Sequence, residues 1–132
     1  MKQLEITAIA NYVHVVDPVR YPGESKAYYR LDVLIPKQDA STLYDLNEHI
    51  RSHAPKCDAF DLLKDGDLLK EHTLYKGCYY FTAKRSESMR EPPQVVGTPR
   101  DGSTCTLTLT PLRHVGRTGP GITYRLDRII FQ

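Results

Sequence analysis

The feature that most restricts the fold of this chain is an alternation of apolar and polar residues that recurs between turn-forming residues. Residues 104–110 show it most clearly, because Cys105, Leu107 and Leu109 alternate with threonines. Successive side chains of a β-strand point to opposite faces, so this pattern predicts a strand with one buried face. The same reasoning predicts strands over residues 4–16, 28–35, 75–85 and 122–131.

Proline and glycine are expected to set the ends of these strands. Asp17-Pro18 is expected to end the first strand, which we expect to be bulged near Asn11, and Pro111 to end the fourth. Turn residues at 21–24 predict a hairpin between the first two strands, and residues 116–121 predict a glycine-rich turn before the last strand. In the second strand the core face is expected to hold Tyr29, Leu31, Val33 and Ile35, and the opposite face Tyr28, Arg30 and Asp32.

One helix is predicted between the second strand and the aromatic segment near the middle of the chain. Its apolar residues Leu43, Leu46 and Ile50 recur at three- and four-residue steps, Asp39 or Ser41 can cap it, and Pro55 stops it. Residues 56–73 are expected to form an irregular loop, with a turn at 65–67. Residues 86–101 predict a mobile excursion in which only residues 95–96 pair with a strand.

These elements predict the fold class. Five principal strands with one helix, no βαβ rhythm and no repeat indicate an all-β protein with a five-stranded, antiparallel OB-type barrel and loop excursions. A chain of 132 residues is long enough to bury a hydrophobic core without disulfides or metal ions, so we expect one domain over residues 1–132.

Composition narrows the function classes. The three cysteines form no CxxC pair, which argues against a disulfide framework and a zinc ribbon and favours a reducing cytosol. No signal sequence and no apolar run near the ~18 residues of a membrane span are present, so we expect a soluble protein with no membrane partner. Residues 1–75 carry nine Lys or Arg against twelve Asp or Glu, whereas residues 76–132 carry nine against four. Residues 76–132 are thus the basic half of the chain, and most of the predicted aromatic strand lies in this half.

The predicted strand over residues 75–85 combines aromatic rings with cationic side chains. Single-stranded nucleic acid needs both, because bases stack on rings and phosphates pair with Lys or Arg. Alternation places Phe81 and Ala83 in the core and turns Tyr80 and Lys84 outward, beside Tyr28 and Arg30 if the two strands share a side of the barrel. Arg85, Arg113 and Arg117 are assigned to loops. The residues predicted to contact a strand are Tyr28, Arg30, Lys76, Tyr79, Tyr80, Lys84, Arg85, Arg113, Arg117, Tyr124 and Arg125.

Other chemistries are less well supported by the sequence. His49, His53 and Cys57 are four apart, but the HExxH glutamate is missing and Pro55 interrupts the helix, so we expect no metal. The aspartates of residues 58–67 would suit a metal-dependent nuclease. Their spacing fits neither a helix face nor a calcium loop, which favours a solvated acidic loop. No catalytic residue and no cofactor is predicted. A phage adaptor module that binds protein instead of DNA is a third hypothesis.

The order of several short motifs resembles a family of phage single-stranded DNA-binding proteins with an OB fold, first catalogued as a bacteriophage domain of unknown function. The motifs are residues 12–15 followed by Pro18, residues 23–29, Leu34-Ile35-Pro36-Lys37 with the helix, residues 64–67, residues 75–83, Pro93 with Val95-Val96, and Gly121-Ile122 leading to Leu126. Two departures are a short segment at residues 97–104 and an end at Gln132 without the acidic tail common in such proteins.

The resemblance implies a function without catalysis. It implies sequence-tolerant coating of single-stranded DNA during phage replication, recombination or repair, in the cytoplasm of an infected bacterial host. It also implies replication or recombination proteins as partners, and self-association.

Overall fold

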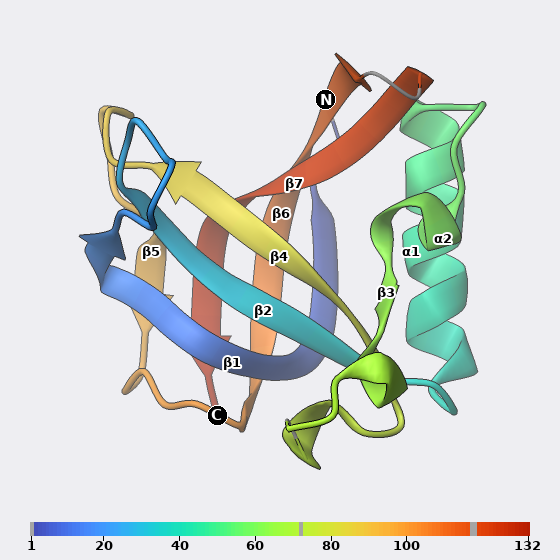
Figure 1. The fold of residues 1–132 in the computed structure, drawn as a ribbon, viewed down its shortest axis with the longest axis horizontal. Coiled ribbons are helices and arrows are strands. Elements are labelled where there is room, and N and C mark those ends of the chain that lie inside the picture. Colours follow the sequence, from blue (N-terminus) through green and yellow to red (C-terminus); the bar gives the residue numbers. More distant parts are fainter. Residues whose placement is uncertain (1, 72, 117–118) are drawn as a thin grey trace.

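The structure, a computed structural model, describes residues 2–71, 73–116 and 119–132. Seven strands form one sheet, in the order β3-β4-β2-β1-β6-β7-β5. The five long strands are β1 (Leu4–Val19), β2 (Tyr28–Pro36), β4 (Cys78–Ser86), β6 (Ser103–Gly116) and β7 (Gly119–Phe131), and the two short ones are β3 (Lys64–Asp65) and β5 (Gln94–Val96). β4 also pairs in parallel with β7, at Lys84 and Arg125, which closes the five long strands into a barrel (Figure 1).

β1 has two partners along its length. Its first half pairs with β6 and its second half with β2, both antiparallel. The register with β2 shifts between Asn11 and His14, and Tyr12 in this gap has a φ of +49°. A bulge bends a strand and increases its twist, which allows β1 to curve around the barrel (Figure 1). The hairpin of β1 with β2 and the bulge near Asn11 are therefore confirmed.

The barrel core follows the predicted alternation. Leu31, Val33 and Ile35 of β2 are buried, and the inward residues of β4 include Phe81 and Ala83. A second, smaller cluster lies on the other face of β2, where Leu34 packs with Tyr75 and Cys78. β2 is thus covered on both faces at its carboxyl-terminal end.

Helix α1 (Ala40–His53) covers one side of the barrel, to the right in Figure 1. The Asp39 carboxylate accepts a hydrogen bond from the Thr42 backbone N–H at 3.2 Å, which satisfies one of the free donors at the helix start. Leu46, His49 and Ile50 are the buried residues of the helix, and the helix ends before Pro55. The predicted helix and its Asp39 cap are confirmed. None of the described helices is both long and apolar enough to cross a membrane.

Two predicted strand ends are wrong, because Pro18 lies inside β1 and Pro111 inside β6. Proline cannot donate to a strand ladder, so it is tolerated where one edge of a strand is open. β1 pairs with β6 only up to Ala10, and β6 pairs with β1 only up to Leu109, so both prolines lie beyond the doubly paired region. Which edge is open depends on the tertiary fold, and the local sequence does not reveal it.

The region before β4 is also more ordered than predicted. Residues 56–73 contain a short helix, α2 (Ala59–Leu62), and a 3-10 helix, η1 (Gly66–Leu68), at the site of the predicted turn. The aromatic strand begins at Cys78 instead of residue 75, because Gly77 has a φ of +73° and interrupts the extended chain. Tyr75 belongs to a second 3-10 helix, η2 (Thr73–Tyr75). The predicted short pairing at Val95-Val96 is confirmed as β5, which runs parallel to β7.

Candidate nucleic-acid interface

The outward faces of β2 and β4 lie side by side in a continuous register. Arg30 is paired with Lys84, Asp32 with Thr82, and Leu34 with Tyr80. Tyr28 stands opposite Ser86 on the same face. The register confirms that Tyr80 and Lys84 share a side of the barrel with Tyr28 and Arg30.

Three hollows cross this face and the adjoining rim of the barrel, and all three share Thr82. The first, of about 280 Å³, lies beside β1 and is lined by Tyr12, Tyr21, Arg30, Leu31, Asp32 and Thr82. The second, of about 330 Å³, extends past Tyr28 and Lys84 to Arg125 of β7. The third, of about 370 Å³, extends from Arg30 and Lys84 to His114 of β6. Together they form one groove.

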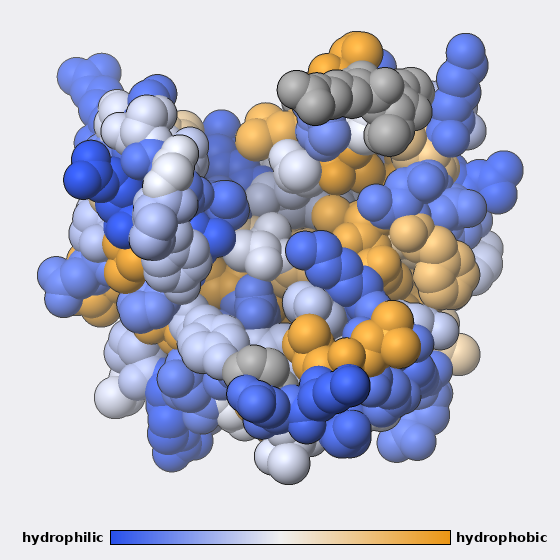
Figure 2. Space-filling model, in the orientation of Figure 1, coloured by the Kyte–Doolittle hydropathy of each residue, from blue (hydrophilic) through white to orange (hydrophobic). Residues whose placement is uncertain are grey.

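The groove is bounded by two projecting segments. Figure 2 shows the surface hollowed between the β1–β2 turn on the left and the β6–β7 hairpin at the upper right. Hydrophobic side chains are exposed on the hairpin side, where Leu112 and Val115 are among the exposed large apolar residues. A concave surface between two loops is the usual location of ligands on barrels of this size.

Two exposed rings in the groove were not predicted from the sequence. Tyr12 is 42% exposed and Tyr21 is 40% exposed, whereas the predicted Tyr28 and Tyr80 are half-buried. Tyr12 was missed because the bulge, with its positive φ, changes the face on which the side chain falls. Tyr21 was missed because it lies in a turn, where no period assigns a face. The one sequence feature that could have indicated a binding role for Tyr21 is an aromatic residue in a turn next to a predicted strand that carries tyrosine and arginine.

The cationic groups of the groove are stacked on rings and paired with one carboxylate. The Arg30 guanidinium lies 4.2 Å from the Tyr21 ring centroid, and Lys84 Nζ lies 5.1 Å from that of Tyr28. Glu24 accepts hydrogen bonds from Arg30 Nη1 at 2.9 Å and from Lys84 Nζ at 3.3 Å. The Tyr21 backbone N–H, Lys84 and Arg30 outweigh desolvation and hold the pKa of Glu24 below its ordinary value, so this carboxylate is ionised at neutral pH.

A partly buried polar network lies under the groove, and its Asp32 and Thr82 also line the first hollow. The Tyr75 hydroxyl donates to the Asp32 carboxylate and accepts from Asn11 Nδ2 at 3.2 Å, and Thr82 Oγ1 donates to Asp32 at 2.7 Å. Burial, and then the Asp32 carboxylate, raise the pKa of Tyr75, which keeps its hydroxyl protonated. The Tyr75 ring also contacts Tyr80, so this network fixes the position of a half-buried ring on the outer face of β4.

Gly66 explains how Tyr75 reaches this position. A Cβ at residue 66 would lie 2.1 Å from the Tyr75 carbonyl oxygen, so only glycine allows the two backbone segments to approach this closely. The aspartate-flanked glycine predicted as a turn is therefore a packing residue.

Tyr124 does not have the predicted role. Its ring contributes to the wall of the second hollow, but the residue is only 1% exposed, so it has no open face on which a base can stack. Its hydroxyl lies 2.7 Å from His49 Nδ1, under helix α1. Tyr124 lies on the inward face of β7 together with Ile122 and Leu126, and all three are buried in the core.

Arg85 also departs from the prediction. It lies in β4, within the strand predicted over residues 75–85, and its guanidinium pairs with Asp127 at 2.9 Å and with the Glu91 carbonyl oxygen at 2.8 Å. Arg125 Nε donates to the same carboxylate at 2.8 Å. Burial alone would raise the pKa of Asp127, but hydrogen bonds from Arg125 and other neighbours lower it, so the pairs are ionic at neutral pH. Both arginines are engaged within the fold.

The remaining predicted contacts that the structure describes line none of the three hollows. Tyr79 is on the inward face of β4, where its ring meets Phe60 edge-on at 5.5 Å and Lys37 Nζ lies 5.1 Å away. Lys76 is exposed just before β4. Arg113 is exposed in β6, not in a loop, and Arg117 lies outside the described residues.

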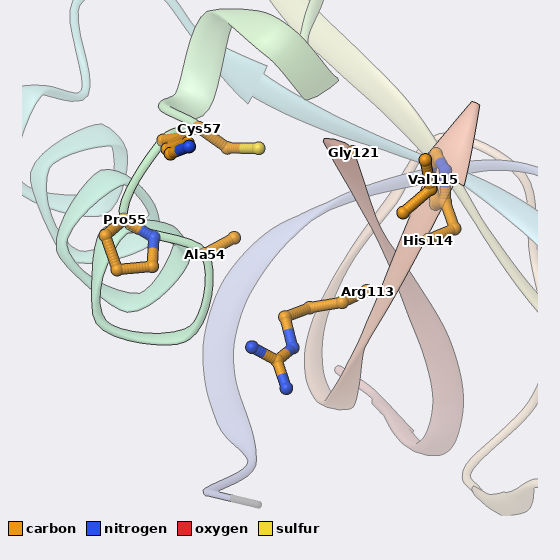
Figure 3. Close-up of a pocket in the computed structure, with 8 residues that line it drawn as sticks. Ala54, Pro55, Cys57, Arg113, His114, Val115 and Gly121 are labelled. Carbon is orange, nitrogen blue, oxygen red and sulfur yellow. The ribbon is translucent and has the colours of Figure 1, made fainter. Parts of the chain in front are cut away.

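A further cavity lies on the other side of the hairpin. Its volume is about 490 Å³, and its lining comes from the segment that follows α1 and from β6 and β7, namely Ala54, Pro55, Lys56, Cys57, Arg113, His114, Val115 and Gly121. Figure 3 shows Arg113 extending from β6 toward the helix side of this cavity. His114 lines both the cavity and the groove. Arg113 therefore lies on the opposite side of the β6–β7 hairpin from Arg30 and Lys84.

The acidic residues considered for a nuclease have structural roles. Asp58 and Asp61 form a reciprocal capping box on α2. Asp65 and Asp67 pair with Lys37 Nζ at 2.8 and 2.7 Å, and these hydrogen bonds lower the pKa values of both carboxylates. Within the described ranges, no group of three or more His, Cys, Asp or Glu is placed to hold a metal ion.

Comparison with known proteins confirms the fold. No protein-family model matches the sequence, and no curated protein does. The single-stranded DNA-binding protein from bacteriophage Enc34, solved in complex with ssDNA, superposes with a TM-score of 0.76 at 16% identity, over 98% of this chain and 85% of that chain. Gp2.5, a single-stranded DNA-binding protein encoded by bacteriophage T7, superposes with a TM-score of 0.63 at 14% identity, over 99% and 91%. The chain thus has the OB-type fold of these phage proteins, as the sequence predicted.

Proposed function

We propose that this protein binds single-stranded DNA along the groove, without catalysis and with tolerance of sequence. The main observation behind the proposal is that tyrosine rings and cationic side chains lie together on one concave surface. Tyr12, Tyr21 and Tyr28 border the same hollows as Arg30 and Lys84. Stacking contributes on the order of 1–3 kcal/mol per base, and each cation that neutralises a phosphate adds salt-dependent affinity.

The structural neighbours support the choice of ligand. Both superposed proteins are single-stranded DNA-binding proteins of bacteriophages, and one was solved with ssDNA. The strands that form the groove here are the ones that bind oligonucleotides in OB folds generally. Coating of DNA during phage replication, recombination or repair in an infected cell, partner replication proteins and self-association belong to the same proposal.

The proposal revises the residues predicted from sequence. The central stacking residues are Tyr12 and Tyr21, with Tyr28 and Tyr80 beside them, and the central cations are Arg30 and Lys84. Lys76, Tyr79 and Arg113 remain proposed peripheral contacts. Tyr124, Arg85 and Arg125 are not included, because each is engaged inside the fold.

The test is fluorescence anisotropy of a labelled oligo-dT of ~20 nucleotides at two salt concentrations, with a duplex of equal length in parallel. Tight binding to the single strand that weakens with salt, with little binding to the duplex, is expected. A magnesium-containing sample, followed by electrophoresis, tests the nuclease alternative. An intact strand is expected, and cleavage or an absence of salt-sensitive binding would overturn the proposal.

A further inference from the structure

The Glu24 carboxylate occupies the place in the groove where a phosphate would pair with both central cations. It lies 2.9 Å from Arg30 Nη1 and 3.3 Å from Lys84 Nζ. Arg30 and Lys84 face each other across the β2–β4 pair, so one anion can contact both. Carboxylate and phosphate oxygens accept the same charge-assisted hydrogen bonds from Arg and Lys.

Glu24 also limits access to Arg30. The Arg30 side chain is only 12% exposed, since it lies between Glu24 and the ring of Tyr21. A phosphate therefore reaches the guanidinium only when the Glu24 carboxylate moves away. Lys84 is more exposed, at 41%, and offers a first contact.

The β1–β2 turn connects Glu24 to a stacking ring. Oε1 of Glu24 accepts from the Tyr21 backbone N–H at 3.0 Å, and the Glu24 N–H donates to the Tyr21 carbonyl oxygen at 3.0 Å. The same Oε1 binds Arg30, whose guanidinium covers the Tyr21 ring. Movement of Glu24 thus removes one hydrogen bond that positions Tyr21 and one that holds Arg30 over the Tyr21 ring.

We propose that Arg30 and Lys84 form a phosphate-binding subsite that Glu24 occupies in the free protein, and that a strand phosphate replaces the Glu24 carboxylate on binding. This inference rests on the proposed function. Glu24 then lowers affinity, because the strand must displace an existing anion. It also lowers the salt dependence, because cations already paired with a carboxylate release no counterions.

The test compares Glu24→Gln with the wild-type protein by anisotropy on labelled oligo-dT over a series of salt concentrations. Gln keeps an acceptor for the Tyr21 N–H but removes the competing charge. The affinity should rise roughly two- to thirtyfold, the range expected for two partly exposed ion pairs. The slope of log K against log salt should steepen by about 1.4, or ~0.7 for each freed cation on a single strand.

Two further variants separate the subsite from a general charge effect. Glu48→Gln changes the net charge equally on an exposed face of α1, far from the β1–β2 turn (Figure 1), and should leave affinity and slope unchanged. Glu24→Asp keeps the charge, but the shorter side chain cannot bridge both cations, so it should raise affinity. An equal gain from Glu48→Gln, or no gain from either Glu24 variant, would overturn the inference while wild-type binding stands. No binding by any variant or the wild type would overturn the proposed function and this inference together.

Discussion

Tyr75 and Tyr80 meet edge to face, with ring centroids 5.0 Å apart and an interplanar angle of 90°. This is a favourable geometry for two aromatic rings. Tyr75 is buried and Tyr80 is half-buried at the outer surface of β4, so the pair joins the polar network to the outer face of this strand. The position of the outer ring therefore depends on Tyr75, whose hydroxyl is held by Asp32 and Asn11.

Removal of that hydroxyl should destabilise the protein. Tyr75→Phe leaves the partly buried Asp32 carboxylate with one hydrogen-bond donor fewer, which costs about 1–3 kcal/mol of unfolding free energy. Urea denaturation measures this loss, and Tyr44→Phe, at an exposed helical tyrosine, provides the control. An unfolding free energy equal to that of the control variant would show that the network contributes nothing to stability.

Arg85 and Arg113 should respond differently to the same substitution. Arg85→Gln breaks the half-buried pair with Asp127, so it should lower stability and leave the salt slope of oligo-dT binding unchanged. Among the described residues, no ion pair engages Arg113, so Arg113→Gln should preserve stability and reduce the slope by about 0.7. Urea denaturation and a salt series of anisotropy titrations distinguish the two. A reversed pattern would restore Arg85 to the interface and remove Arg113.

Stability should also depend on His49. Its Nε2 lies 2.9 Å from the Lys2 carbonyl oxygen, which can only accept, so Nε2 carries the proton and Nδ1 accepts from Tyr124. Burial holds the pKa of His49 below its ordinary value of 6.5, which means that the unfolded chain binds the proton more readily. The stabilisation is complete above about pH 6.5 and is lost as the pH falls below it.

Urea denaturation at pH 8, 6.5 and 5 tests this dependence. Wild-type protein should lose more unfolding free energy between pH 8 and pH 5 than His49→Gln, which has no proton to bind at this position. Equal losses in the two proteins would contradict the assignment of a neutral, buried imidazole.

The sequence allowed the local features of this fold to be predicted, and the errors arose where distant contacts decide. Alternation assigned the faces of β2 and β4 correctly, and Asp39 marked the start of α1. Pro111 was misjudged because an open strand edge depends on where a neighbouring strand ends. Arg85 was misjudged because its partner, Asp127, is 42 positions away along the chain. For the site, the pairing of rings with cations was foreseeable, but the bulge that exposes Tyr12 changes the side-chain period at that residue.

Anisotropy of labelled oligo-dT with Tyr12→Ala, Tyr21→Ala and the double variant tests the central claim most directly. Tyr44→Ala removes an exposed ring from α1 and serves as the control. Each groove variant should lose about fivefold or more in affinity, the lower end of the value of one stacked base, and the double variant more, while Tyr44→Ala binds as the wild type does. Unchanged affinity in the double variant would contradict the placement of single-stranded DNA in this groove.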